Sequence, residues 1–435
     1  MILGKILNRS FYFLLQNNYF INFSIMLSGF YLIISFIDAV ILFIPNVGDE
    51  WYYTRDLIYY INNGYQKSVI HGISIPFTII SNMFYHLTNN ISLSLRLTGS
   101  LFTLILVLYI LFRCKIFISN RKLFLCHFFL LIGTTAGTFY GTNDSIFFTS
   151  FLIFVFESTI VYNKSKINIL LLVVSTAFLI MSRPVAIVYL SIFFFGNIIF
   201  KVVRGEYKIS IKQGIILPCF ILGLVITLFA NFPRFSNGIY KISYADKSTT
   251  YKTDDARFNW TQWAFYSQLV GNKNRFGFFP GFVNWKGAKI YKEINGESSL
   301  PKTYYLYLVN HTPNVIRRSI TSIIEISLIS IRYVGILLIL LPFYFYQKVK
   351  YNVKDKNINY AYIIIIGVIT WAIIWPLLVQ HRWLYPFYVL LIFMIFNDED
   401  AQKDEYFNNV LLLNMFILNA VTIWALWKWG IFRSI

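Results

Sequence analysis

Long apolar runs recur along the whole chain, and they constrain its fold more than any other feature. Most have about 17 to 25 residues, enough for a helix rising about 1.5 Å per residue to cross a hydrocarbon core of about 30 Å. The strict alternation that marks a membrane strand is absent, so helices must satisfy the backbone hydrogen bonds. Only 13% of the residues are charged and 57% are hydrophobic, which excludes a water-soluble globule. The sequence predicts an all-α polytopic membrane protein.

We expect about eleven transmembrane helices. They cover residues 23–44, 93–112, 123–140, 145–161, 167–181, 185–200, 214–230, 319–346, 361–379, 384–396 and 410–427. No small-residue cleavage site precedes the first run, so we interpret it as an uncleaved span rather than a signal peptide.

Lysine and arginine residues of the short loops set the orientation. With a cytoplasmic N-terminus, the short outer loops hold little beyond Arg183 and Arg382. The cytoplasmic loops then hold Arg113, Lys115, Arg121, Lys122, Lys164, Lys166, Lys201, Arg204, Lys208, Lys212, Lys348, Lys350, Lys354 and Lys356. The net charge of +19 is thereby assigned to topology and membrane lipids, with no nucleic-acid partner. Abundant Ile, Asn, Lys, Phe and Tyr suggest a bacterial inner (plasma) membrane protein.

The expected division of the chain has three parts. Residues 1–230 form an N-terminal membrane module whose first outer loop, 45–91, carries two short amphipathic interfacial helices at 51–61 and 76–87. Residues 231–318 form a small non-cytoplasmic cap between the seventh and eighth spans. Residues 319–435 form the C-terminal transmembrane helices.

Two adjacent acids, Asp49 and Glu50, follow the first span, with Arg55 and Asp56 one turn later. A carboxylate at a helix N-terminus is stabilised by backbone donors and the helix dipole, and it can accept a proton from a hydroxyl. Asp49 is therefore the candidate general base. The alternative is that both acids merely cap the first interfacial helix.

Three further residues near this level of the membrane are candidates. Asp144 lies in the tight turn before the fourth span, where it is a catalytic candidate or an N-cap. Asp38 lies about 9 Å below the outer end of the first span, so it faces a wet cavity or a neighbouring helix. His71, which follows the acids in the first loop, is a candidate too; the alternative is that it is a polar residue of the surface.

Arg96, Arg183 and Arg382, the last preceded by His381, approach the same face from separate spans. Their forked donors match a phosphate, although each arginine alone could be an interfacial anchor. The three cysteines, Cys114, Cys126 and Cys219, show no metal or disulfide spacing. We predict no metal site from the pattern and leave a divalent cation possible.

Within the eighth span, Glu325 and Arg332 lie seven residues apart on one face. We expect them to form a structural pair.

The order of these motifs resembles a known family. Asp49-Glu50, the interfacial helices and then Ser94 to Gly99 opening the second span are similar to the C-type (GT-C) multi-spanning glycosyltransferases. The acid in the turn after the third span, Asp144, and the run from Arg382 to Pro386 resemble the protein O-mannosyltransferase and lipid A aminoarabinose transferase branch. The segment from His71 to Pro76 departs from the His-Pro-Pro of that branch.

The resemblance implies a hexosyl- or pentosyltransferase that uses a polyprenyl-phosphate-linked sugar. The sugar would pass to a glycan, lipid or protein hydroxyl outside the cytoplasm with inversion, with Asp49 as base and Glu50 beside it. One alternative is a polymerase or ligase of lipid-linked glycans, which uses a diphosphate-linked donor. The other is a transporter or flippase, which predicts ionisable residues along a midplane path.

Overall fold

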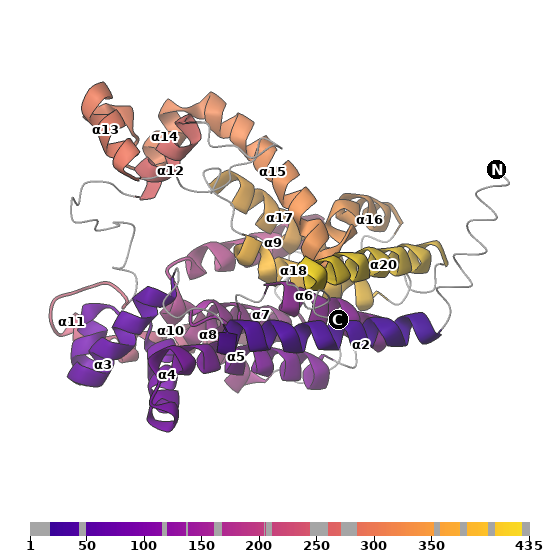
Figure 1. Cartoon of the computed structure of the whole chain (residues 1–435), viewed down its shortest axis with the longest axis horizontal. Coiled ribbons are helices and arrows are strands. Elements are labelled where there is room, and N and C mark those ends of the chain that lie inside the picture. The colour runs from indigo at the N-terminus through magenta and orange to yellow at the C-terminus, as the bar shows by residue number, and fades with distance from the viewer. Residues whose placement is uncertain are drawn as a thin grey trace. The chain divides into compact units, whose positions relative to one another are not determined.

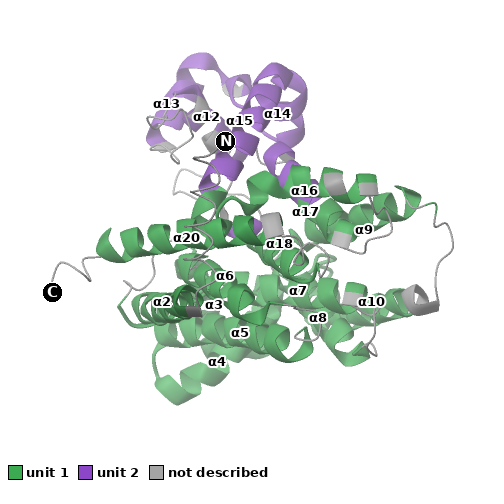
Figure 2. Cartoon of the chain, turned by 90° about the vertical axis from the view of Figure 1, so that its right-hand side faces the viewer, with its two compact units in different colours: residues 1–245, 330–364, 385–435 green, residues 246–329, 365–384 purple. Residues whose placement is uncertain are grey.

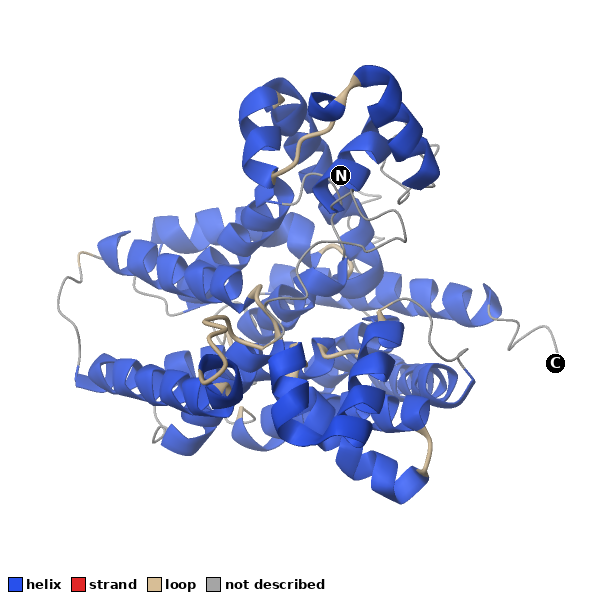
Figure 3. Ribbon diagram, turned by 90° about the vertical axis from the view of Figure 1, so that its left-hand side faces the viewer, coloured by secondary structure: helices blue, strands red, loops and turns tan. Residues whose placement is uncertain are grey.

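The computed structural model describes residues 18–42, 49–114, 120–135, 138–160, 168–203, 205, 211–243, 260–270, 285–351, 357–374, 381–398 and 405–428 (Figure 1). Within these ranges every regular element is a helix and none is a strand (Figure 3). The all-α prediction is confirmed for this part of the chain.

The chain divides into two compact units (Figure 2). Unit 1 comprises residues 1–245, 330–364 and 385–435, and unit 2 comprises residues 246–329 and 365–384. The expected cap at 231–318 therefore falls mostly in unit 2, together with a later segment. Residues 244–259 and 271–284 of that cap lie outside the described residues.

The bounds of the helices are as follows. Unit 1 holds α2 (Asn18–Ile37), η1 (Asp38–Leu42), α3 (Glu50–His71), α4 (Ile75–Thr88), α5 (Ile91–Arg113), α6 (Arg121–Thr135), α7 (Asp144–Ile160), α8 (Ile169–Ser182), α9 (Ala186–Val203), α10 (Ile211–Ala230), α11 (Phe232–Phe235), α16 (Leu337–Tyr351), α18 (Tyr385–Phe396) and α20 (Glu405–Lys428). Unit 2 holds α12 (Trp260–Leu269), α13 (Trp285–Asn295), η4 (Glu297–Ser299), α14 (Tyr304–Asn310) and η5 (His381–Leu384). Two helices, α15 (Thr312–Val334) and α17 (Asn357–Ile374), are divided between the units.

The structure supports an α-helical membrane protein. Four described helices are long and apolar enough to cross a bilayer, at Tyr19–Leu42, Ile91–Arg113, Ala186–Val203 and Phe407–Lys428. A fifth crossing is formed if α15 and α16 count as one bent span. Each of the eleven expected spans coincides with at least one helix, but several of these helices are shorter than a full crossing.

Packing in unit 1 distinguishes surface helices from a central one. α2 packs on α6 and α20, and its opposite face exposes Phe23, Met26, Phe30 and Ile33, as a lipid-facing helix does. Every residue of α18 is buried, and this helix packs on α6 and α7. α18 therefore lies inside the helical bundle although it is only 12 residues long.

The single span expected over 319–346 is wrong in one respect, because the chain breaks at Gly335 between α15 and α16. Gly335 has a left-handed φ of 63°, a conformation that favours glycine. The Asn414 side chain of α20 satisfies the broken backbone, accepting from the Ile336 amide at 2.7 Å and donating to the Val334 carbonyl at 3.2 Å. The apolar pattern continues through this break, so hydropathy gave no sign of it.

The two helices expected in the first loop are confirmed as helices. α3 and α4 are both longer than predicted, and α3 continues past Gly64 as far as His71. Gly64 has φ 72° and ψ −178°, so α3 is kinked there. Gly72, with φ 97°, then ends the helix, and its amide contacts the Ser68 and Val69 carbonyls.

Candidate functional site

The first candidate residues meet in a buried ion pair between Glu50, at the start of α3, and Arg96, on α5. Arg96 Nε donates to Glu50 Oε1 at 3.0 Å and Nη2 donates to Oε2 at 3.1 Å. Both side chains are at most 3% exposed. Arg96 Nη1 also donates to the Val40 carbonyl of η1 at 3.3 Å. One forked guanidinium thereby connects α3, α5 and the end of the first span.

The turn between α6 and α7 packs tightly against this pair because of two glycines. A Cβ at Gly99 would lie 2.8 Å from the Tyr140 carbonyl oxygen, so α5 approaches the turn backbone closely. A Cβ at Gly141 would lie 2.8 Å from the Leu95 Cβ and 2.9 Å from Glu50 Oε1. Glycine at both positions lets the turn lie directly on the Glu50 carboxylate.

A second buried ion pair closes the other side of this turn. Arg183, which caps the C-terminus of α8, places Nη2 2.6 Å from Asp144 Oδ1, at the first residue of α7. Their side chains are 13% and 3% exposed. The Thr142 hydroxyl donates to the other Asp144 oxygen at 3.3 Å. Asp144 is therefore the first residue of α7 and also the ion-pair partner of Arg183.

Asn143 connects the elements around both pairs. Its Oδ1 accepts from the Tyr53 hydroxyl of α3 and from Arg183 Nε, the latter at 2.7 Å. Its Nδ2 donates to the Ser74 hydroxyl at 3.2 Å and to the Ser182 carbonyl at 2.5 Å. The buried amide uses both donors and both acceptor positions, so it fixes Arg183 relative to α3 and the start of α4.

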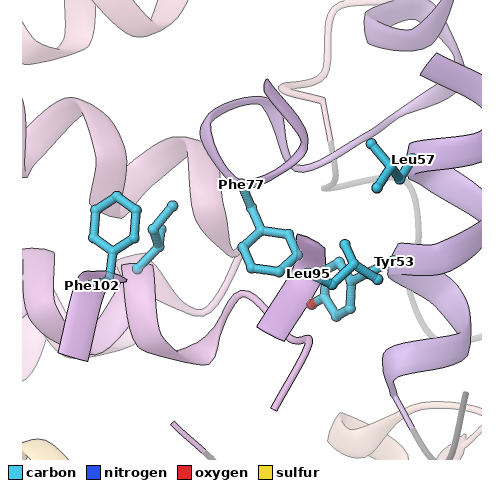
Figure 4. Packing of buried hydrophobic residues seen from close by; sticks show 6 residues of the cluster. Tyr53, Leu57, Phe77, Leu95 and Phe102 are labelled. Carbon is cyan, nitrogen blue, oxygen red and sulfur yellow. The ribbon is translucent and has the colours of Figure 1, made fainter. Parts of the chain in front are cut away.

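An apolar cluster supports these polar contacts. Tyr53 and Leu57 of α3 pack with Phe77 of α4 and with Leu95 and Phe102 of α5 (Figure 4). The Tyr53 and Phe77 rings meet edge to face at 5.1 Å. Tyr53 thus packs its ring in this cluster while its hydroxyl reaches Asn143.

Asp49 is more exposed than the carboxylates of Glu50 and Asp144. It precedes α3 and is partly exposed, whereas Glu50 and Asp144 are buried. Asp49 occupies the N-cap position, but its side chain makes no capping hydrogen bond to a described residue. Its position therefore matches the alternative role at the helix start, but the hydrogen bond of a cap is not formed. Gly48, which precedes it, lies outside the described residues.

Asp38 begins η1 and is partly exposed. It lies two residues before Val40, whose carbonyl accepts from Arg96.

The remaining first-loop candidates lie along α3. Arg55 is exposed, and its guanidinium stacks 4.7 Å from the Trp51 ring centroid. Asp56 is buried. His71 is exposed at the end of α3 and stacks on Tyr59 at 4.3 Å between ring centroids. His71 and the helix start are thus at opposite ends of α3.

His381 and Arg382 form the first part of η5, which belongs to unit 2. Arg382 is partly exposed. The contacts of Arg96 and Arg183 given above lie within unit 1.

Some interactions had no clear signal in the sequence. Glu325 pairs with Arg318 at 3.1 Å, seven residues earlier, so the expected Glu325–Arg332 pairing is wrong. Both arginines lie at helical spacing from Glu325, and only packing selects between them. Asn143 and Tyr53 were also missed, although the compact turn from Gly141 to Ser145 could have drawn attention to Asn143.

Among the described residues, no group of three or more His, Cys, Asp or Glu side chains could hold a metal ion.

Comparison with known proteins adds no assignment. No protein-family model matches the chain, and no curated protein matches it.

Proposed function

We propose that the protein is a glycosyltransferase that moves a sugar from a polyprenyl-phosphate carrier to an acceptor hydroxyl. The proposal includes eleven spans, a cytoplasmic N-terminus, a bacterial inner membrane and a site on the non-cytoplasmic side. The observation that carries it is the meeting of two carboxylate–guanidinium pairs from four separate segments on the Gly141–Asp144 turn. The partly exposed Asp49 lies next to one of these pairs.

Asp49 acts as the general base in this proposal. It takes the proton of the acceptor hydroxyl while the acceptor oxygen bonds to the anomeric carbon from the face opposite the phosphate. The bond from that carbon to the phosphate oxygen breaks, so the configuration inverts and polyprenyl phosphate leaves. The partial exposure of Asp49 suits a base that must reach a substrate, and the buried Glu50 beside it holds Arg96.

The arginines take different roles. Nε, Nη1 and Nη2 of Arg96 all donate to oxygens of the protein. This favours a positioning role for Arg96 over the phosphate contact expected from the sequence. Arg183 is more exposed and is held at one edge by Asn143, so it is the better phosphate ligand in unit 1. Arg382 and His381 remain proposed donor contacts, and Asp144 keeps Arg183 oriented.

The test uses the full chain in lipid nanodiscs with short polyprenyl-monophosphate hexoses and pentoses. The acceptor is a total envelope extract, and release of polyprenyl phosphate is measured. We expect turnover with a monophosphate donor and a loss of at least about 100-fold in Asp49→Asn, since a positioned base contributes about 10² to 10⁴. Glu293→Gln, at an exposed acid in α13, is the matched control and should retain activity.

Two results would replace this proposal with its alternatives. Turnover of a diphosphate-linked donor alone would favour the polymerase or ligase. Movement of an intact lipid-linked sugar across the bilayer without bond cleavage would favour the flippase.

A further inference from the structure

The part of α15 that belongs to unit 2, drawn in purple in Figure 2, exposes its apolar side chains and buries its polar ones. The exposed apolar residues recur at helical spacing and form the α15 apolar face: Ile316, Ile320, Ile323, Ile324 and Leu328. On the opposite side, Ser319, Ser322 and Glu325 are buried. A helix that faces water shows the reverse arrangement, so this face is suited to an apolar surrounding.

The length of this face matches one leaflet of a bilayer. From Ile316 to Leu328 the helix rises about 18 Å, at 1.5 Å per residue. The hydrocarbon core is about 30 Å thick, so one leaflet contributes about half of that. Between these two residues the charged side chains are Arg317, Arg318 and Glu325, and of the three Arg317 is the exposed one. One acyl chain can therefore lie along the face until it reaches Arg317.

Two adjacent arginines near the start of α15 point in different directions. Arg318 is turned inward, where its Nη2 lies 3.1 Å from Glu325 Oε2, and its side chain is 12% exposed. Arg317 is exposed, and its three-residue spacing to Ile320 places it on the same side of the helix as the apolar face. Glu325 is the only acidic residue of α15. Arg317 therefore ends the apolar face with a positive charge that this helix does not neutralise.

We propose that the α15 apolar face and Arg317 together bind an anionic phospholipid. The acyl chain lies along the isoleucines, and the forked donors of the Arg317 guanidinium hold the headgroup phosphate. A headgroup with net negative charge is favoured, because the ammonium group of a zwitterionic lipid opposes the attraction of its phosphate to Arg317. This lipid is held rather than consumed, so the proposal does not depend on sugar transfer and goes beyond the proposed function.

A second copy of the chain would fit this face less well than a lipid does. In a parallel pair of α15 helices, the two Arg317 guanidinium groups would lie side by side, and like charges repel. In an antiparallel pair, each Arg317 would lie against the apolar Leu328 of the other copy, where a charge without a partner is costly. A phospholipid places a phosphate beside Arg317 and hydrocarbon beside Leu328 in a single orientation.

The test measures which lipid contacts the face, using the full chain in lipid nanodiscs. Ile324→Cys is labelled with bimane; it lies about 10 Å along the helix from Arg317, at the depth of the middle of an acyl chain. The native cysteines are buried, which directs the label to the new thiol. Nanodiscs of phosphatidylcholine contain equal small amounts of either phosphatidylglycerol or phosphatidylcholine with brominated acyl chains, and bromine quenches bimane on contact.

We expect both brominated lipids to quench the label, and phosphatidylglycerol to quench it more strongly. Adding Arg317→Gln should lower the relative affinity for phosphatidylglycerol about fivefold, the effect of one basic residue at an anionic surface. Arg317→Lys keeps the charge and should retain most of the preference. Lys286→Gln, which removes an exposed charge from α13, is the matched control and should leave the preference unchanged.

Four results would overturn the proposal. Quenching by aqueous iodide in place of brominated lipid would mean that the face lies in water. Quenching by neither would mean that protein covers it, as in a dimer. Equal quenching by the two brominated lipids would remove the anionic preference. An equal loss of preference in Arg317→Gln and Lys286→Gln, or no loss in Arg317→Gln, would remove the specific role of Arg317.

Discussion

The carboxylate of Glu50 and the guanidinium of Arg96 face each other through two hydrogen bonds of 3.0 and 3.1 Å, with both side chains almost completely buried. The two opposite charges compensate each other in the protein interior, where almost no water reaches them. The pair also joins two parts of the chain that lie 46 residues apart.

Removing one charge of this pair should be more harmful than removing both. Glu50→Gln leaves the Arg96 cation buried without its counter-ion, so we expect a loss of about 3 to 5 kcal/mol in the free energy of unfolding. The double variant Glu50→Gln/Arg96→Met should recover part of that loss. Denaturation in detergent measures the free energy of unfolding of both variants. Equal stability of Glu50→Gln and the wild type would contradict the buried pairing.

The close approach of the turn makes Gly141 sensitive to a single methyl group. In Gly141→Ala the new Cβ would meet Leu95 and Glu50, so the turn or the carboxylate must move. We expect a loss of about 1 to 3 kcal/mol and reduced transfer. Gly29→Ala in α2 is the control, because nothing lies within 4 Å of its Cβ and alanine favours a helix. If both variants behaved alike, the tight packing at Gly141 would be disproved.

The amide of Asn143 should be irreplaceable by a carboxylate. Asn143→Asp keeps both acceptor positions but loses the donors to Ser74 and Ser182, at about 1 to 3 kcal/mol for each unpaired group. It also adds a second carboxylate beside Arg183, which should raise the KM for a phosphate donor more than it lowers kcat.

The control for this variant is Asn168→Asp. Asn168 uses its side-chain oxygen to accept from the Leu171 amide at the start of α8, and aspartate can do the same. Thermal unfolding and donor kinetics of the two variants should therefore diverge. Parallel behaviour would show that the Asn143 donors are dispensable.

Gly335 and Gly205 share a left-handed backbone but not their surroundings. Alanine at either position costs about 1 to 2 kcal/mol for the backbone alone. At Gly335 the Cβ would also overlap Asn414 Oδ1, forcing that side chain away from the Ile336 amide. We expect Gly335→Ala to lower the Tm well below that of Gly205→Ala. Similar Tm values for the two variants would contradict the clamp by Asn414.

The helices could be predicted because apolar runs of this length indicate helices, however these helices then pack together. The positions of α5, α7 and α9 were anticipated to within a few residues. The break at Gly335 could not be predicted, because a lone glycine in an apolar run is also found inside intact helices. What decides its conformation is Asn414, almost 80 residues later in the sequence.

The candidate residues were chosen by residue type and by their expected level in the membrane, and neither criterion predicts which residues pair. Sequence distance does not reveal that Glu50 pairs with Arg96 and Asp144 with Arg183, since either acid suits either arginine. Asn143 escaped notice because an uncharged amide in a turn is usually a local cap. Its role depends on contacts with α3, α4 and α8, which only the folded chain brings together.

Both ion pairs and the Asn143 amide draw all their described partners from residues 40–183. During synthesis, the ribosome has therefore delivered every one of these groups before it makes Asp246, the first residue of unit 2. These described contacts between α3 and α8 can therefore form before unit 2 is synthesised.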